Sequence, residues 1–580
     1  MKKFILILTI LTCLIIVNHT IAQELNMDFE PGKLIIKTNE ALNLQVTGYT
    51  GISLIDSLNQ LFGVISIEQL FTSAGLDPQK LELYNQIGLG RIYVLTLPDT
   101  TDILNAVEAY KNLTEIEYAE PNMYLRPLDV YPCDWFFQEE GWQWGLYNDG
   151  SFGYDVCKVR ADIKAPEAWQ IEKGDTNLIV GIIDTGIRRS LGELRNRVWV
   201  NYAERNGLPG VDDDHNGYTD DSIGWNFVDN TPFVEPESPC QICLHGTHIA
   251  SIIGSETDST NDCMDMAGIN WKCKLMNLKV DYCIWEDDYC IDNVFSDIAI
   301  ARAIWYATVM GAKVLNLSFG GIIVEKEMLS DSNQTIEDVL TGAYNSGVVS
   351  IAAMGNGYDI YKGKWYAYYP AFSTKTLAVG ATDCNDNRVI HFDETPYWQS
   401  SYDDYYPHID LVAPGHDIVT LIGLFAGTSA STPFVAGIAS LVITHRKKLI
   451  PNEVLTAENI YEVLRHTADD TVGHTYNQWG EFEDTLCFDN YYGWGRANAF
   501  KALVAVSHGD PNNDSKIDVV DVYYLINYLF KGGPPPVPAQ EMGDANCDKK
   551  VSVSDIAYLI NYLFKGGQPP SLCYTDCSQP

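Results

Sequence analysis

The sequence has few basic residues for its size. Its 580 residues include 38 lysines and arginines against 77 aspartates and glutamates, which gives a formal net charge of −39. Such a charge repels nucleic acid and anionic membrane surfaces, so neither is expected as a partner, and it attracts cations such as Ca²⁺. Long low-complexity segments are also lacking, and 46% of the residues are hydrophobic. The chain is therefore expected to fold, into roughly three or four domains.

Apolar runs long enough to span a membrane are lacking as well. Met1-Lys2-Lys3, the apolar residues 4–17 and the ending Thr20-Ile21-Ala22 predict a secretory signal peptide over residues 1–22. A membrane anchor is the alternative, but this run is shorter than the ~20 residues needed to span. The mature protein is expected to be released without an anchor.

Cysteine, by contrast, is abundant: 14 residues, 13 of them after the predicted signal peptide. Export makes disulfides the default, and an odd number leaves at least one thiol free or paired between molecules. Connectivity cannot be deduced from spacing, but three close pairs could close short loops: Cys263 with Cys273, Cys283 with Cys290, and Cys573 with Cys577. Cys240 and Cys243 have zinc-ligand spacing without a second such pair at finger distance, which favours a local disulfide.

The hydrophobic pattern divides the chain. Residues 23–128 predict a small α+β unit, with strands near 32–38, 64–71 and 91–97 and a helix at 102–111. From about residue 140, buried strands near 178–183, 274–280, 313–319, 348–354 and 377–382 alternate with helices near 296–310 and 335–344. This alternation predicts an α/β domain with a parallel sheet and helices on both faces, whose sites lie at the carboxyl ends of strands.

Three polar residues lie at the ends of predicted elements. Asp184 ends the first buried strand, His245 opens an apolar helix, and Ser429 begins a second one that contains Pro433 in its first turn. Alone, each has a structural explanation, and Ser429 would be a helix cap. Together they suit a hydrolase in which Ser attacks, His takes its proton and Asp orients the imidazole.

The motifs around these residues resemble the signature blocks of the subtilases, the subtilisin-like serine endopeptidases. They are Asp184-Thr185-Gly186, His245-Gly246-Thr247-His248 and the run 427–433, in that family's order. The resemblance implies a triad of Asp184, His245 and Ser429, with Asn356 as oxyanion donor and Ser318, Phe319 and Gly320 as a substrate-pairing strand. It also implies a polypeptide substrate, an acyl-enzyme and no catalytic cofactor.

The acidic loop at 211–221 alternates carboxylates around a glycine, and so many like charges are relieved by a hard cation. Related subtilases carry a structural Ca²⁺ loop of this kind, and the expected ligands are Asp212, Asp214, Asn216 and Asp221. A solvated acidic loop is the alternative.

A sequence repeat follows, in which residues 509–533 recur at 543–567 with an offset of 34 residues. Each copy places oxygen-bearing residues at positions 1, 3, 5, 9 and 12 of an EF-hand-like loop. The residues are Asp510, Asn512, Asp514, Asp518 and Asp521 in the first copy, and Asp544, Asn546, Asp548, Ser552 and Asp555 in the second. The terminal Asp, the single following helix and the pairing of copies resemble a type I dockerin, which implies two Ca²⁺ and a cohesin-bearing scaffold protein as partner. A calcium-stabilised tail without a cohesin is the alternative.

The first unit resembles a subtilase propeptide, which implies a chaperone and inhibitor removed by cleavage between Asn122 and Trp135. The expected organisation is therefore a signal peptide at 1–22, propeptide at 23–128, peptidase at 129–507, dockerin-like repeats at 508–570 and a tail at 571–580. The sequence predicts a secreted, extracellular zymogen of a serine endopeptidase, attached to a cell surface only if the dockerin-like module holds it there. The rival interpretations are a catalytically silent subtilase fold tethered by its dockerin, and a redox or zinc protein built on Cys240 and Cys243.

Overall fold

The structure is a computed structural model of the chain. It describes residues 29–42, 50–73, 78–98, 101–123, 131–138, 141–152, 155–237, 242–257, 266–286, 289–323, 334–359, 364–365, 367–391, 398–402, 408–470 and 488–574. The predicted signal peptide lies outside these residues. The chain forms two compact units, Met1–Leu128 and Asp129–Pro580.

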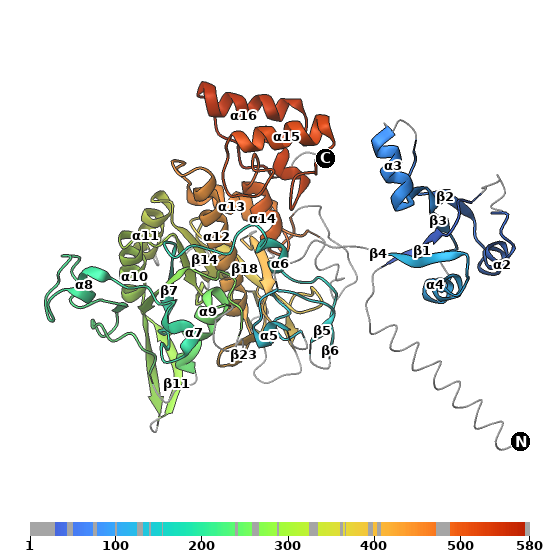
Figure 1. Ribbon diagram of the computed structural model, residues 1–580. Helices are drawn as coiled ribbons and strands as arrows, with labels where there is room; N and C mark the ends of the chain where they lie inside the picture. The colour runs from blue at the N-terminus through green and yellow to red at the C-terminus, as the bar shows by residue number, and fades with distance from the viewer. Residues whose placement is uncertain are drawn as a thin grey trace, which may run out of the picture. The chain divides into compact units, whose positions relative to one another are not determined.

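The first unit is a four-stranded antiparallel sheet in the order β2-β3-β1-β4, with two helices packed on one face (Figure 1). Its buried core joins Leu34 and Ile36 of β1 to Ile55 of α2 and Tyr110 of α4, which confirms an α+β unit. The elements are β1 (Phe29–Thr38), α2 (Ser53–Phe62), β2 (Ser66–Gln69), α3 (Pro78–Ile87), η1 (Leu89–Arg91), β3 (Ile92–Thr96), α4 (Ile103–Lys111) and β4 (Ile116–Met123).

The second unit is built on a seven-stranded sheet in the order β21-β18-β14-β12-β7-β9-β8, in which every pairing is parallel. The predicted parallel sheet is confirmed. The strands are β7 (Ile179–Asp184), β8 (Gly224–Asn226), β9 (Lys274–Lys279), β12 (Val314–Leu317), β14 (Val349–Ala353), β18 (Leu377–Thr382) and β21 (Leu411–Pro414).

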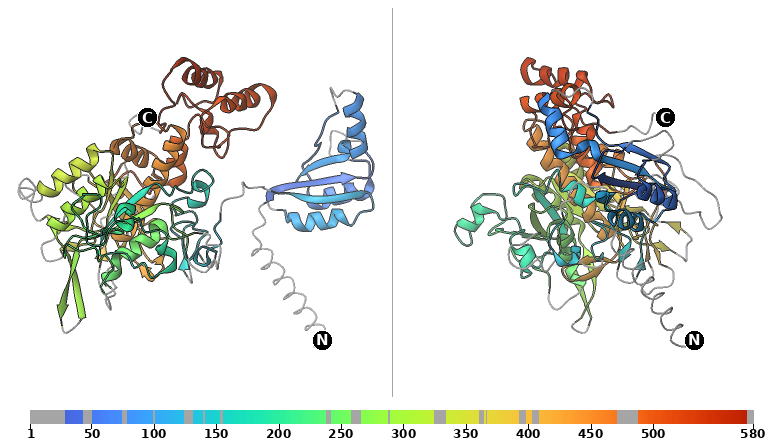
Figure 2. Two further views of the ribbon diagram at one scale, coloured as in Figure 1. Left: turned by 60° about the vertical axis from the view of Figure 1, so that its left-hand side comes forward. Right: turned by 45° about the vertical axis from the view of Figure 1, so that its right-hand side comes forward.

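Helices cover both faces of this sheet because alternate side chains of each strand point to opposite sides. On β7, Val180 and Ile182 pack with α9 and α12, whereas Ile183 packs with α10 and α11 (Figures 1 and 2). The helices of the unit are α5 (Trp135–Gln138), α6 (Ala165–Ala168), α7 (Gly192–Arg195), α8 (Tyr202–Asn206), η2 (Ile242–Leu244), α9 (His245–Gly254), α10 (Asp297–Val309), α11 (Gln334–Asn345), α12 (Thr428–Leu449), α13 (Ala457–His466) and α14 (Ala499–Val506).

The central helix of the second unit is α12, whose 22 residues are all buried except Lys447 and Lys448. Gly427, before its first residue, has φ 124°, a conformation that side-chain-bearing residues rarely adopt. Pro433 is the sixth residue of the helix and lies inside it, beyond the first turn that the sequence predicted. The Ser429 carbonyl, which an N–H at position 433 would reach, accepts instead from the Ser318 hydroxyl at 3.0 Å. The helix therefore begins at a sharp turn, and its second residue, Ser429, lies at the carboxyl edge of the sheet.

A long hairpin, β10 (Asp281–Glu286) with β11 (Tyr289–Phe295), projects from the body of this unit (Figures 1 and 2). The remaining strands form short two-stranded ribbons: β5 (Ser151–Phe152), β6 (Asp155–Val156), β13 (Gly321–Ile323), β15 (Tyr358–Asp359), β16 (Lys364–Trp365), β17 (Ala367–Tyr369), β19 (Ile390–His391), β20 (Trp398–Gln399), β22 (Ile418–Thr420) and β23 (Gly423–Phe425).

The repeats form two loop-and-helix copies, whose helices are α15 (Val519–Lys531) and α16 (Val553–Lys565), separated by η4 (Gln540–Gly543). Each helix begins with a capping box and ends at a glycine with φ near 70°, Gly532 or Gly566. The all-α module is confirmed. Within the part of the chain that the structure describes, no helix combines the length and apolarity that crossing a bilayer would require.

Candidate active site

Asp184 and His245 meet at the carboxyl edge of the parallel sheet. Asp184 ends β7, His245 opens α9, and the ring Nδ1 lies 2.8 Å from Oδ1 and 3.0 Å from Oδ2 of the carboxylate. A Cβ on Gly246 would stand 2.7 Å from the Gly186 carbonyl oxygen, so only glycine allows this approach. Burial lowers the pKa of His245, but the Asp184 carboxylate outweighs it and the pKa is raised above 6.5.

Ser429 lies at the start of α12 and is 9% exposed. Its hydroxyl donates to the carbonyl oxygen of Ser318 at 2.8 Å, and the Ser318 hydroxyl donates back to the Ser429 carbonyl at 3.0 Å. Ser318 directly follows β12, which neighbours β7 in the sheet. The serine therefore sits at the same sheet edge as Asp184 and His245, beside the positive end of a long helix dipole.

Asn356, three residues after β14, has a fixed orientation. Its Oδ1 accepts from the Thr428 backbone N–H at 2.8 Å and from the Thr428 hydroxyl at 2.9 Å. With Oδ1 engaged twice, Nδ2 is the group left to donate. A Cβ on Gly427 would approach this Nδ2 to 3.0 Å, so glycine keeps space for it.

Phe425 packs on two histidines of α9, a contact that sequence reasoning missed. Its ring lies edge-on to His245 at 5.2 Å between centroids and stacks on His248 at 4.5 Å. The His248 Nδ1 is 2.7 Å from the Thr420 hydroxyl, and burial lowers the pKa of His248 to about 4. His248 is therefore neutral near pH 7 and adds no charge beside His245.

The predicted substrate strand, Ser318 to Gly320, lies between β12 and β13 and outside the paired strands. Ser318 and Phe319 are buried and Gly320 is exposed. The Phe319 ring stacks on Phe295 at the end of β11, with centroids 5.0 Å apart. The hairpin thus borders this segment.

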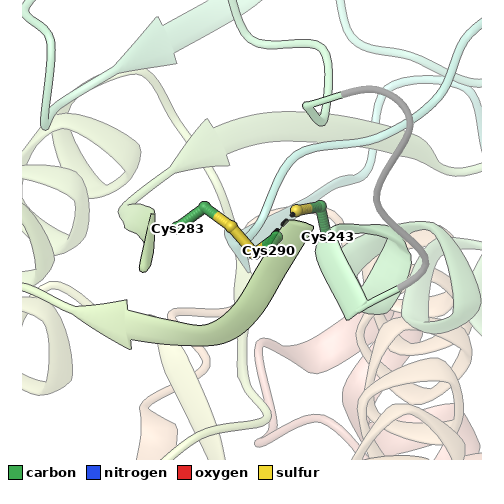
Figure 3. Close-up of side chains that lie close together, drawn as sticks. All are labelled: Cys243, Cys283 and Cys290. Atoms are coloured by element: carbon green, nitrogen blue, oxygen red, sulfur yellow. Dashed lines mark hydrogen bonds between the residues drawn. A yellow bond between two sulfur atoms is a disulfide. The ribbon is translucent and has the colours of Figure 1, made fainter. Parts of the chain in front are cut away.

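Three cysteines cluster where the hairpin meets the turn before His245 (Figure 3). Cys283 and Cys290 form a disulfide across the hairpin, which confirms that predicted pair. The Cys243 sulfur, in η2, lies 3.7 Å from the Cys290 sulfur and belongs to a disulfide of its own. That agrees with the preference for a disulfide over a zinc site, while Cys240 lies outside the described residues.

Two other predicted cysteine pairs are wrong. Cys273 is a free thiol, buried beneath α9, and burial raises its pKa to about 12, so it does not pair with Cys263. Cys573 bonds Cys547, not Cys577. Cys547 reaches Cys573 although 26 residues separate them in the sequence, a pairing that spacing alone cannot reveal.

A further disulfide joins Cys157 to Cys384 across 227 residues and has no sequence signal. Among the described residues, Cys273 is a free thiol, in line with the expectation that an odd number of cysteines leaves at least one unpaired.

The three acidic loops share one backbone conformation. In each, the first Asp accepts hydrogen bonds from the backbone N–H groups four and five residues later, and positions 4 and 6 have φ between 56° and 93°. The repeats achieve this without glycine at position 6, where Ser515 and Lys549 stand. The loop beginning at Asp212 is therefore folded like the two loops of the repeats.

Around the Asp212 loop, the structure adds Glu204, which the sequence analysis missed. Its carboxylate accepts from the backbone N–H groups of Asp213, Asp214 and Asp220, and its oxygen clusters with those of Asp212 and Asp214. Asp221 is fully buried and accepts from Tyr306, Asn201 and Asn216. Only the folded chain brings the helix residue Glu204 to the loop.

In the repeats, the residues at positions 1 and 12 are buried and those at position 9 cap the helices. Asp510, Asp521 and Asp555 are fully buried, and Asp544 is 4% exposed. Burial raises the pKa of Asp510 to about 7, of Asp521 to about 8 and of Asp555 to about 6. The remaining expected ligands, Asn512, Asp514, Asn546 and Asp548, lie along the same loops and accept or donate within them.

Comparison with known proteins finds three family models along the chain. The subtilase family matches residues 175–495, the fervidolysin N-terminal prodomain matches 80–122, and the dockerin type I domain matches 508–564.

Curated relatives agree. Thermitase of Thermoactinomyces vulgaris is 29% identical over 59% of this chain and 93% of its own length. A thermophilic serine proteinase of Bacillus sp. (strain AK1) is 28% identical over 68% of this chain and 75% of its own. A cell wall-associated protease of Bacillus subtilis (strain 168) is 28% identical over 70% of this chain and 38% of its own. Because the subtilase model alone spans more than half of the sequence, the chain belongs to the subtilase family, as a serine endopeptidase with an N-terminal prodomain and a type I dockerin domain.

Proposed function

We propose that Ser429, His245 and Asp184 form the catalytic triad of this endopeptidase and that Asn356 completes its oxyanion hole. The observation that carries the proposal is the convergence of the four groups on one sheet edge, with the His245 ring held by Asp184 at 2.8 Å. A silent binding protein would not need this arrangement.

In the proposed reaction, Ser429 Oγ leaves the Ser318 carbonyl and attacks the substrate carbonyl carbon. Its proton passes to His245 Nε2, while Asp184 accepts the hydrogen bond from Nδ1–H and stabilises the imidazolium. The developing oxyanion accepts from Asn356 Nδ2 and from the Ser429 backbone N–H. The imidazolium then protonates the leaving amine, which leaves the acyl-enzyme. Water then attacks the acyl-enzyme by the same steps, with His245 taking its proton, and releases Ser429.

Ser318, Phe319 and Gly320 would pair with the backbone of an extended polypeptide. Their position outside the paired strands supports this, and the Ser318 carbonyl, which accepts from Ser429 in the structure, is released when Ser429 attacks. Recognition through the backbone accepts many sequences.

The protein is proposed to be a secreted zymogen. The prodomain match supports an inhibitory propeptide at 23–128, cut between Asn122 and Trp135 before the peptidase meets substrate. The dockerin domain supports an extracellular or cell-surface setting and a cohesin-bearing scaffold as partner. Apolar side chains remain exposed on its two helices for such a partner, namely Val519, Val520, Tyr523, Phe530, Val553 and Phe564.

Calcium is proposed as a structural ion at three sites. Asp521 Oδ1 is buried without a hydrogen-bond partner among the described residues, as a ligand oxygen kept for a cation would be. The proposed ligands come from Asp212, Asp214, Asn216, Asp221 and Glu204 in the peptidase, and from positions 1, 3, 5, 9 and 12 of the repeats. Oxygen-only ligand sets suit Ca²⁺, which would neutralise these like charges.

Expression of residues 23–580 with Ca²⁺ tests the catalytic proposal. The wild type should cleave off its propeptide and react with a fluorophosphonate probe, whereas Ser429→Ala should do neither. Ser431→Ala is the matched control, because Ser431 is buried on the same helix and donates only to the Ala413 carbonyl. An uncleaved, unlabelled wild type, or equal loss in both variants, would refute the assignment.

A further inference from the structure

The dockerin domain packs against the far end of the helix that begins beside the nucleophile. Leu449 ends α12, and with Ile450 it forms one buried cluster with residues of both repeats. The cluster members from the repeats are Ile517, Val522, Leu525, Ala545, Ile556 and Leu559. α15 and α16 accordingly lie beside the α12–α14 region in both figures (Figures 1 and 2). Two residues of the peptidase, Leu449 and Ile450, therefore complete the hydrophobic core of the dockerin domain.

A buried arginine ties the same helix end to the last part of the chain. Arg446 is 1% exposed, and its guanidinium donates to Glu453 at 2.5 and 2.9 Å. It also donates to the Pro570 carbonyl at 2.6 Å and to the Val506 carbonyl at 3.3 Å. Buried cations need such compensation, so unfolding of the segment around Pro570 would remove one of the hydrogen bonds that stabilise the buried Arg446 guanidinium.

Both repeats contact the peptidase, the first through its loop and the second through the segment just before its loop. Asn513, at position 4 of the first loop, donates to the Gln170 carbonyl at 3.0 Å. Met542, two residues before the second loop, is fully buried in the main core of the peptidase. The repeats are therefore packed against the peptidase rather than separate from it.

The second loop is also fixed covalently. Cys547, at its position 4, bonds Cys573, and the Cys573 backbone N–H donates to the Ala505 carbonyl of α14 at 3.0 Å. His508, which starts the module, is buried and bonds the Asp544 carbonyl at 2.7 Å. The second loop is therefore linked to α14 through one disulfide and one backbone hydrogen bond.

We infer that the dockerin domain is a calcium-dependent clamp on the peptidase, so that cation binding in its two loops stabilises the catalytic body through the end of α12. The inference rests on the proposed calcium binding. Without the cation, buried ligand oxygens such as Asp521 Oδ1 lack a partner, the loops open, and the packing against Leu449 and Ile450 is lost. The exposed residues Val519, Tyr523 and Phe530 face away from this interface and stay available to an outside partner.

The test uses residues 23–580 carrying Ser429→Ala to prevent self-digestion. Calorimetric titration counts the calcium sites, and thermal unfolding is followed by the fluorescence of buried tryptophans such as Trp144 and Trp169 in the peptidase core. Asp521→Asn with Asp555→Asn should abolish two sites and lower the peptidase transition in saturating Ca²⁺ by about 5 °C. Asp338→Asn, on the far helix α11, is the matched control and should change neither.

A decoupling variant, Leu449→Ala with Ile450→Ala, leaves every loop residue in place. It should still bind calcium at the repeats but lose most of the calcium-dependent shift of the core transition. Since the loop variants could fold poorly, an independent readout uses the chain whose loops are unaltered. There, hydrogen exchange of residues 441–450, at the end of α12, should slow on calcium addition.

If the repeats melt in a separate transition while calorimetry still counts their two sites, calcium binding stands and the clamp is refuted. If no heat arises from the repeats, the calcium proposal itself fails and the clamp with it.

Discussion

Thr428→Val should weaken the proposed oxyanion hole without touching a reacting group. The Thr428 hydroxyl donates to Asn356 Oδ1 at 2.9 Å and accepts from the Gly355 backbone N–H at 3.1 Å. Valine keeps the shape and removes both bonds, while the residue 428 backbone N–H still holds Asn356 at 2.8 Å. A net hydrogen bond contributes about 1 kcal/mol, and one bond orients Asn356 directly. Loss of about 1 kcal/mol of transition-state stabilisation lowers kcat about fivefold.

The assay is steady-state hydrolysis of a chromogenic peptide, with active enzyme counted by a fluorophosphonate. KM should stay near its wild-type value, because the oxyanion forms only in the transition state. Asn356→Ala should cost more, about 3 kcal/mol, a magnitude that comes from subtilisin itself. Because Thr428 acts through Asn356, the double variant should be no slower than Asn356→Ala alone.

Thr432→Val is the matched control. Thr432 is buried on the same helix, and its hydroxyl donates only to the Thr428 carbonyl at 2.8 Å. The positioning role is refuted if Thr432→Val slows hydrolysis as much as Thr428→Val, or if the effects of Thr428→Val and Asn356→Ala add fully.

Three further outcomes are expected. As the proposed base, His245 must be neutral to accept a proton, and its pKa is raised above 6.5, so kcat/KM should fall as pH drops through that higher pKa. Asp184→Asn removes the carboxylate that raises this pKa, so the acid limb of the pH profile should move to lower pH. Leu441→Ala, at a fully buried position of α12, should lower the free energy of unfolding by about 3 kcal/mol in urea titrations of the inactive chain, and an unchanged midpoint would contradict its place in the core. Replacing Cys157 and Cys384 by serine should cost about 2–5 kcal/mol because the bond closes a long loop; equal melting temperatures of the oxidised and reduced wild type would argue against the bond.

The elements that sequence predicts well are those that depend on local pattern. β7 follows from a continuous apolar run ending at Asp184, and α12 from a buried run after Gly427. The repeat loops follow from fixed spacing of oxygen ligands, which determines their backbone. The three signature blocks add the family, and with it the sheet and the convergence of distant residues.

What the sequence did not predict depends on contacts between distant segments. Phe425 lies between two histidines, Glu204 reaches the Asp212 loop from a helix, and Cys157 meets Cys384, yet no spacing links any of these pairs. The packing of Met542 into the peptidase core was missed for the same reason. The hairpin at 281–295 was missed because its strands carry mixed polar and aromatic residues without strict alternation.

The buried free thiol has a consequence for oxidative folding. Thiol–disulfide exchange requires a thiolate, and a pKa of about 12 leaves Cys273 almost entirely protonated near neutral pH, buried beneath α9. While the chain is still unfolded, the same residue has an ordinary thiol pKa and can attack any bond that has formed. Packing of α9 onto β9 therefore ends the period in which Cys273 can scramble the other pairs, so sheet formation itself protects the native disulfides from this thiol.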